Sequence, residues 1–137
     1  MSNNTFNFEL VSPEQKLISE QAFQVTIPGE GGDVGVRAGH MALLMSVRSG
    51  VVEIIRSEGG STEKIFIAGG FADVSQTNCT VLAEQAVPVA SLQADKLEAE
   101  ITKLNEDLTL SDTSDEKAKI SERLALVHSM LDAVKAT

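Results

Sequence analysis

The side chains of this chain that could most readily take part in chemistry lie close together in the sequence, between positions 27 and 44. This stretch, IPGEGGDVGVRAGHMALL, carries Asp33, Arg37 and His40 among five glycines. A carboxylate and an imidazole can exchange protons, and a guanidinium, which stays protonated, can donate charged hydrogen bonds. The glycines allow positive φ angles or close backbone approaches, so the run predicts tight turns set into a sheet. No reaction requires this pattern, whereas a closely shaped loop surface does.

Motifs that would support catalysis or cofactor binding are incomplete. Gly29 begins a G-x-G-x-x-G pattern, but Val34 occupies the third glycine position, and there is no G-K-[ST] phosphate loop. The sequence has no H-E-x-x-H, C-x-x-C or G-x-S-x-G segment, and its histidines, His40 and His128, are far apart. The single cysteine, Cys79, cannot form an internal disulfide and is interpreted as a half-buried strand residue. We therefore expect no catalytic residues, no metal and no cofactor.

Composition indicates a soluble globular protein with an acidic surface. Hydrophobic residues make up 42% of the 137 residues, and the net charge is −9. Residues 1–88 carry five basic and ten acidic residues, and residues 89–137 carry six and ten. Nucleic acids and anionic lipids bind surfaces with clustered Lys and Arg, whereas this acidic chain would repel them. We therefore expect no nucleic-acid partner. Apolar runs are too short to span a bilayer, and residues 1–20 do not have the pattern of a signal or transit peptide.

Residues 1–88 have the pattern of an all-β sandwich. Short β-branched or alternating segments recur between turn residues, and all ten glycines lie in this half. Turns at residues 57–63 and 76–79 predict two hairpins. The predicted strands are Phe6–Leu10, Val25–Ile27, Val34–Val36, Leu43–Val47, Val51–Arg56, Lys64–Ala68, Phe71–Ser75 and Thr80–Glu84.

Residues 89–137 change to a helical pattern, with Ser91 as a candidate N-cap. The segment SDTSD at 111–115 breaks the first helix, and Thr113 followed by Glu116 predicts a capping box for a second. Both helices have one apolar face. These faces comprise Leu97, Ile101, Leu104, Leu108, Ile120, Leu124, Val127, Leu131 and Val134. The predicted fold class is a mainly β N-terminal sandwich followed by an α-helical C-terminal antiparallel hairpin, which could stay docked or detach.

Three segments resemble the ε subunit of F-type ATP synthases. Residues 27–44 match the family pattern PG-x-x-G-[ED]-[LIV]-G-[IV]-x-x-GH-x-x-LL. Residues 65–74 (IFIAGGFADV) match its strand–GG–strand, and residues 8–13 (FELVSP) match its opening. The resemblance implies a non-catalytic central-stalk rotor subunit that clamps γ to the c-ring, so that proton-driven rotation reaches the catalytic head. Beyond residue 86, only the helix–turn–helix layout agrees.

The resemblance also implies particular contacts for the sandwich. Asp33 and His40 would lie at its ring-facing end, where the acid could pair with a basic c-subunit residue in a salt-sensitive contact. Gly69, Gly70 and Phe71 would lie near γ. The implied location is the cytoplasmic face of a bacterial inner membrane, where the subunit is peripheral and held only through the complex.

In many family members the C-terminal helices reach the catalytic head of α and β subunits and restrain ATP hydrolysis. The basic residues that could make such contacts here are Lys117, Lys119, Arg123 and Lys135. Some members bind ATP through I/L-D-x-x-R-A, but here Gln93 replaces the acid and Lys96 replaces the Arg. ATP sensing is therefore expected to be weak or absent.

Two other functions stay open from the residues alone. A free-standing ligand-binding β-sandwich with a helical appendage would need a concave apolar pocket, and an aromatic content of only 4% counts against it. A hydrolase would need a nucleophile paired with a base, which no motif supplies. Whether the hairpin inhibits hydrolysis or is static is also left open by the sequence.

Overall fold

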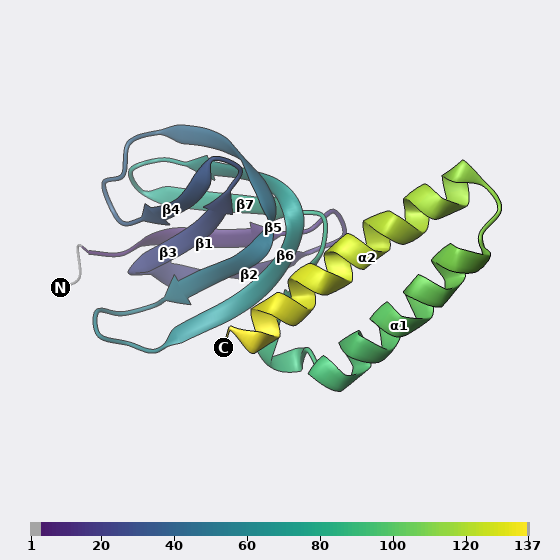
Figure 1. The fold of residues 1–137 in the computed structure, drawn as a ribbon. Coiled ribbons are helices and arrows are strands. Elements are labelled where there is room, and N and C mark those ends of the chain that lie inside the picture. The colour runs from purple at the N-terminus through teal and green to yellow at the C-terminus, as the bar shows by residue number, and fades with distance from the viewer. Residues whose placement is uncertain (1–3, 137) are drawn as a thin grey trace. The chain divides into compact units, whose positions relative to one another are not determined.

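The computed structural model describes residues 4–136, which form two compact units divided between Val87 and Pro88. The first unit is a β-sandwich and the second is a helical hairpin (Figure 1). The predicted fold class is therefore confirmed. No helix within residues 4–136 combines the length and the apolar character needed to cross a membrane.

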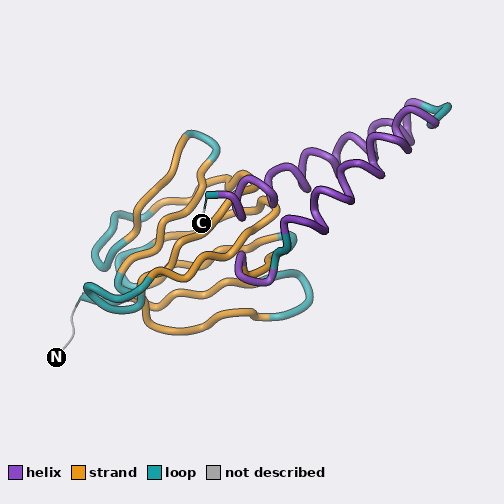
Figure 2. Tube along the Cα trace, turned by 60° about the horizontal axis from the view of Figure 1, so that its bottom comes forward, coloured by secondary structure: helices purple, strands orange, loops and turns teal. Residues whose placement is uncertain are grey.

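The sandwich is built from one continuous hydrogen-bonded sheet that curls around its own core (Figure 2). The strand order is β2-β1-β7-β6-β5-β3-β4, and β8 also pairs with β6. β1 and β7 run parallel, whereas the other neighbouring strands of this order are antiparallel. The strands are β1 (Phe6–Val11), β2 (Lys16–Ala22), β3 (Gln24–Gly29), β4 (Gly32–Val36), β5 (Leu43–Ile55), β6 (Thr62–Val74), β7 (Asn78–Ala83) and β8 (Ala86–Pro88).

The core of the sandwich follows from the alternation of apolar residues along these strands. In β1, for example, Phe6, Phe8 and Leu10 are buried, whereas the residues between them are exposed or half-buried. The same period of two places inward-facing residues of the other strands in one apolar cluster. Cys79 is fully buried in this cluster rather than half-buried.

Three features of the sheet differ from the predicted strands, and one of them is the three-residue strand β8, which was not predicted. β2 was not predicted, because Ile18 and Ala22 are the two apolar residues of its sequence KLISEQA that turn inward. Within residues 4–136 it is an edge strand that pairs only with β1. β5 and β6 each span 13 residues, where the sequence predicted two shorter strands. The predicted breaks at Gly50 and at Gly69–Gly70 are places where a long strand continues, because glycine permits bends without ending the pairing.

The second unit contains a short 3₁₀ helix, η1 (Val89–Ser91), and two antiparallel helices, α1 (Ala94–Leu110) and α2 (Ser114–Lys135). All nine predicted apolar-face residues are buried or half-buried. Thr113 caps α2 as predicted, since its side chain accepts a hydrogen bond from the Glu116 N–H at 3.2 Å. The prediction for Ser91 was wrong: Ser91 ends η1, and the N-cap of α1 is Gln93, which makes no side-chain capping bond.

Candidate functional site

Asp33 is the second residue of β4 and follows Gly32, which comes directly after the two-residue turn of the β3–β4 hairpin. Gly32 has φ +134° at the start of β4, so a residue with a side chain would be strained there. The Asp33 carboxylate accepts a hydrogen bond from Arg48 on β5, with Nη2 and Oδ1 2.6 Å apart. Both side chains are about half exposed, so the ion pair is open to water and salt. The predicted surface acid is present, but it already has a basic partner within the chain.

His40 ends a β-turn that begins at Arg37. The His40 N–H donates to the Arg37 carbonyl at 3.1 Å, and Gly39 at the third position has φ +86°, as a type II turn requires. The Gly39 N–H donates to the carbonyl of Gln76 at 2.8 Å, which ties this turn to the β6–β7 connection. The imidazole Nδ1 lies 2.7 Å from the Met41 carbonyl oxygen. Because a carbonyl only accepts, Nδ1 carries the proton in this contact.

Asp33 and His40 line two separate surface hollows. Asp33 belongs to a hollow formed by the β3–β4 turn together with Leu43 and Met45 of β5. His40 belongs to a hollow that includes Arg37 and Gln24, and the described lining residues of the two hollows do not overlap. The structure therefore presents two separate polar features, one near the start of β4 and one at and beyond its end, and not one catalytic pair.

The pair of glycines in the middle of β6 has a clear structural reason. Gly69 and Gly70 have φ +91° and +147°, and a Cβ on Gly70 would lie 1.8 Å from the carbonyl oxygen of Leu82. The next residue, Phe71, is 56% exposed and pairs across the sheet with Leu82, which is 52% exposed. These two side chains line a shallow apolar hollow with Val11. The glycines therefore serve internal packing, and Phe71 contributes to the surface.

The basic residues of the helices differ in their surroundings. Arg123 on α2 makes a two-pronged contact with Glu100 on α1, with Nε–Oε2 2.7 Å and Nη2–Oε1 3.2 Å. The hydrogen bonds to Glu100 raise the pKa of Arg123 above its ordinary value. Lys119 lines a hollow near the turn between the helices. Lys135 lies in the last turn of α2, where a positive charge interacts favourably with the helix dipole. Lys117 is exposed in the first turns of α2.

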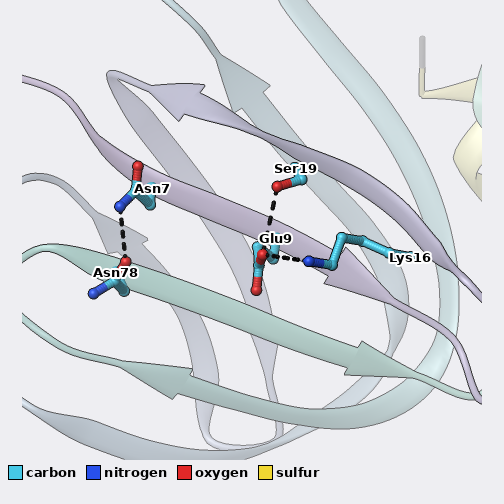
Figure 3. A network of polar contacts seen from close by, with 5 residues as sticks. All are labelled: Asn7, Glu9, Lys16, Ser19 and Asn78. Atoms are coloured by element: carbon cyan, nitrogen blue, oxygen red, sulfur yellow. Dashed lines mark hydrogen bonds and ion pairs between the residues drawn. The ribbon is translucent and has the colours of Figure 1, made fainter.

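A polar cluster on the outer face of β1, β2 and β7 is structural (Figure 3). Glu9 accepts hydrogen bonds from Lys16 at 2.9 Å and Ser19 at 3.4 Å, and Asn7 donates to Asn78 at 3.0 Å. The hydrogen bond and positive charge of Lys16 hold the pKa of Glu9 below its ordinary value. These are cross-strand neighbours that satisfy one another, so they form a surface ladder and not a reactive constellation.

Three residues of the candidate surface were missed by sequence reasoning, namely Arg37 as a site residue, Arg48 and Leu82. Arg48 meets Asp33 only because the register of β3 and β5 shifts between Thr26 and Gly29. Leu82 could have been suspected, since it is an apolar residue at an outward position of an alternating strand, between buried Val81 and Ala83.

The arrangement offers surfaces for binding. Within residues 4–136, no group of three or more His, Cys, Asp or Glu side chains is placed to hold a metal ion. Gln93 and Lys96, at the degraded ATP pattern, are both exposed at the start of α1. The candidate functional site is thus the outer surface around β4, β5 and β6, with the charged residues of the hairpin as a second set.

Comparisons with known proteins agree with this picture. Residues 5–89 match the family described as ATP synthase, Delta/Epsilon chain, beta-sandwich domain. The ATP synthase epsilon chain of Parvibaculum lavamentivorans is 42% identical over 118 residues, covering 86% of this chain and 89% of that protein. The ATP synthase epsilon chain of Rhodospirillum rubrum is 39% identical over 132 residues, covering 96% of this chain and 97% of that protein.

A solved structure shares the fold at low sequence identity. It is a chain in the Euglena gracilis mitochondrial ATP synthase, in a structure of OSCP, F1 and c-ring. The TM-score is 0.77 at 22% identity, and the alignment covers 96% of this chain and 80% of that one. From the matched sandwich and the similarity of nearly the whole sequence to epsilon chains, the chain belongs to the ATP synthase delta/epsilon family, as a non-catalytic epsilon-type subunit of that complex.

Proposed function

We propose that this subunit couples c-ring rotation to γ, with residues 1–88 as the docking module and residues 89–137 as a regulatory module. The observation that carries the proposal is an outward-facing row of residues across four strands of the sandwich. Ser46, Phe71, Leu82 and Val11 are successive cross-strand neighbours on β5, β6, β7 and β1. Exposed large apolar side chains at the centre of such a row are typical of a protein interface.

The γ subunit is the proposed occupant of the row that contains Phe71. Gly69 and Gly70 support this surface indirectly, because the close approach of β6 to β7 at Gly70 places Phe71 opposite Leu82. A partner that covers both side chains would remove apolar surface from water, which contributes about 25 cal/mol for each Å².

The c-ring is the proposed partner of the surface around Asp33, and His40 contributes beyond the other end of β4. The internal ion pair changes how the acid works, because a basic c-subunit residue must share or displace Arg48. Both charges are solvent-exposed, so the contact should weaken as salt rises. The subunit would then be held at the cytoplasmic face of a bacterial inner membrane through the complex.

The hairpin is the proposed restraint on ATP hydrolysis, acting through contacts of α2 with the α and β subunits. Lys117, Lys119, Arg123 and Lys135 are the proposed contact residues. In the folded hairpin Arg123 is engaged by Glu100, so it would become available only when the two helices separate there. The other three residues would be available in either state.

The experiment uses ATP synthase stripped of this subunit, to which the full chain or residues 1–88 are added back. Retention on the complex and the rate of ATP hydrolysis are recorded for each. We expect both forms to be retained and hydrolysis to be faster with residues 1–88. Equal hydrolysis rates would refute the restraint but keep the coupling role, and loss of both forms from the complex would refute the coupling role.

A further inference from the structure

Arg37 is an exposed residue whose guanidinium group is held in place by two neighbours. Its Cζ lies 4.8 Å from the centroid of the Phe23 ring, within the range of a cation–π contact. Its Nε donates a hydrogen bond to the side-chain oxygen of Gln24 at 2.8 Å. Both neighbours lie where β2 passes into β3, so the sandwich itself orients the guanidinium. Among residues 4–136, the two terminal nitrogens of Arg37 have no hydrogen-bond acceptor.

Arg37 also differs from the other arginines of the chain. Of the four arginines, Arg48, Arg56 and Arg123 each form an ion pair with a carboxylate of the same unit. No carboxylate among the described residues pairs with Arg37. Arg37 is thus the arginine among residues 4–136 that its neighbours orient without a carboxylate neutralising it. Such a group is available to an acceptor from outside the chain.

The surroundings of Arg37 provide space for such an acceptor. The hollow beside it has a volume of about 340 Å³ and is lined by Gln24, Gly35, Arg37, Ala38, Gly39 and His40, with no carboxylate among them. The type II turn keeps the Cα atoms of its first and last residues, Arg37 and His40, within about 7 Å of each other. The hydrogen bond from Gly39 to Gln76 fixes this turn to the sandwich. The hollow therefore has an ordered wall that carries two basic side chains.

We propose that Arg37, with His40 beside it, binds the carboxylate of an Asp or Glu side chain on a partner protein. The two terminal nitrogens of a guanidinium match the two oxygens of a carboxylate in a bidentate pair. A free polyanion is disfavoured, because the acidic chain repels it. A carboxylate on an assembled partner is instead held at high effective concentration. The identity of the partner as an ATP synthase subunit rests on the proposed function, whereas the carboxylate chemistry does not.

The first test uses the isolated full chain labelled with ¹⁵N and titrated with sodium acetate at constant ionic strength, with sodium chloride as the reference salt. We expect saturable shifts of the Gly39 and His40 amide signals that chloride does not produce. Arg37→Gln should abolish these shifts. Arg37→Lys should weaken them, because lysine keeps the positive charge but lacks the two parallel N–H donors of the guanidinium. Lys64→Gln, which removes one positive charge from the same sandwich, should leave them unchanged.

Non-saturating shifts, or equal shifts in the Arg37→Gln variant, would overturn the proposal. Inorganic phosphate in place of acetate distinguishes the other source of an oxyanion. If phosphate binds more than tenfold tighter than acetate, the hollow is a phosphate site and the assignment to a protein carboxylate is overturned.

The second test measures the concentration of the full chain needed for half-maximal retention on the stripped synthase. Arg37→Gln should raise it on the order of tenfold, since a hydrogen-bonded charge pair is lost, whereas Lys64→Gln should change it less than twofold. Equal values for both variants would refute a partner carboxylate. If the unaltered chain is not retained either, the proposed function fails, and the acetate titration still decides whether the site exists.

Discussion

At Gly70 the backbone of β6 comes so close to β7 that a single added methyl group has no room. The Cβ of an alanine would lie 1.8 Å from the Leu82 carbonyl oxygen, and φ is +147°. We expect Gly70→Ala to lower the free energy of unfolding by about 2–4 kcal/mol, because both the backbone strain and the clash must be relieved. Chemical denaturation followed by circular dichroism measures the change.

Gly35→Ala is the matched control for this prediction. Gly35 is also in a strand, but it is exposed, its φ is not positive, and a Cβ there meets no atom within 4 Å. We expect its effect to stay within about 0.5 kcal/mol. Similar effects at both glycines would show that the close approach at Gly70 does not matter for stability.

The pH dependence of stability should reveal the burial of Cys79. Burial, and secondly the charge of Asp73, raise the pKa of its thiol from an ordinary value of 9.0 to about 12. As the pH rises, the thiol therefore loses its proton in the unfolded chain before it does so in the folded chain. The free energy of unfolding falls between about pH 9 and about pH 12. The slope from this group is about 1.4 kcal/mol per pH unit, and below pH 8 it contributes nothing.

Comparison with Cys79→Ala isolates that slope. The variant lowers stability at every pH by the loss of packing, but its free energy of unfolding should fall less steeply between pH 9.5 and 11. Urea denaturation at several pH values gives both curves. Parallel curves would mean that the thiol ionises as easily in the folded chain as in the unfolded one.

The identity of the surface residues could be predicted from sequence, but their partners could not. Asp33 and His40 stood out because a turn requires neither an acid nor an imidazole, whereas Phe71 was named through the resemblance of residues 65–74 to the ε family. The contact between Asp33 and Arg48 depends on a register shift between two strands, and the contact between Arg37 and Phe23 depends on where β2 meets β3. Neither is encoded in a local pattern, because both join residues from different strands.

At the scale of elements, local signals succeeded where one face is buried and failed where it is not. The alternation in β1 and the helical period in α1 and α2 predicted these elements, because each has one continuous apolar side. The edge strand β2 has mostly polar residues and pairs, among the described strands, with β1 alone, so its sequence carries little signal. The prediction that Ser91 caps the first helix was wrong because Ser91 belongs to the short 3₁₀ helix η1, and α1 begins three residues later.

The start of α2 depends on the side chain of Thr113, which accepts the Glu116 N–H. In a full capping box, the Glu116 carboxylate would accept a hydrogen bond from the Thr113 N–H. Here it accepts one from the Ser111 hydroxyl at 3.0 Å instead. We expect Thr113→Ala to destabilise the first turn of α2 by about 1 kcal/mol, because one N–H loses its acceptor. Hydrogen exchange of the first-turn amides in the full chain measures this.

Thr109→Ala is the control, since Thr109 lies on an exposed face near the end of α1 and its hydroxyl donates to the carbonyl of Asn105. Alanine favours a helix more than threonine, so exchange in α1 should be unchanged or slower. Faster exchange at the start of α2 with Thr113→Ala alone would support the cap. Equal exchange in the unaltered chain and in Thr113→Ala would contradict it.

At the scale of the whole molecule, the two units differ in how much each depends on the rest of the chain. The apolar cluster of the sandwich is made only of residues between Phe6 and Ala86. The hairpin has a single apolar seam and one two-pronged ion pair, Arg123 with Glu100, and exposed pairs of this kind contribute about 0.2–1 kcal/mol. A two-helix unit of this size is marginal without further packing.

We therefore expect residues 1–88 to fold alone, whereas residues 89–137 alone should be largely unfolded. Amide spectra test this: the core signals of residues 1–88 should superimpose on those of the full chain, because the fragment retains every member of the cluster. The helical fragment should show much weaker ellipticity at 222 nm than the same residues contribute in the full chain. Collapse of the 1–88 spectrum would mean that the sandwich needs the helices to fold, and it would remove the basis for treating residues 1–88 as an independent docking module.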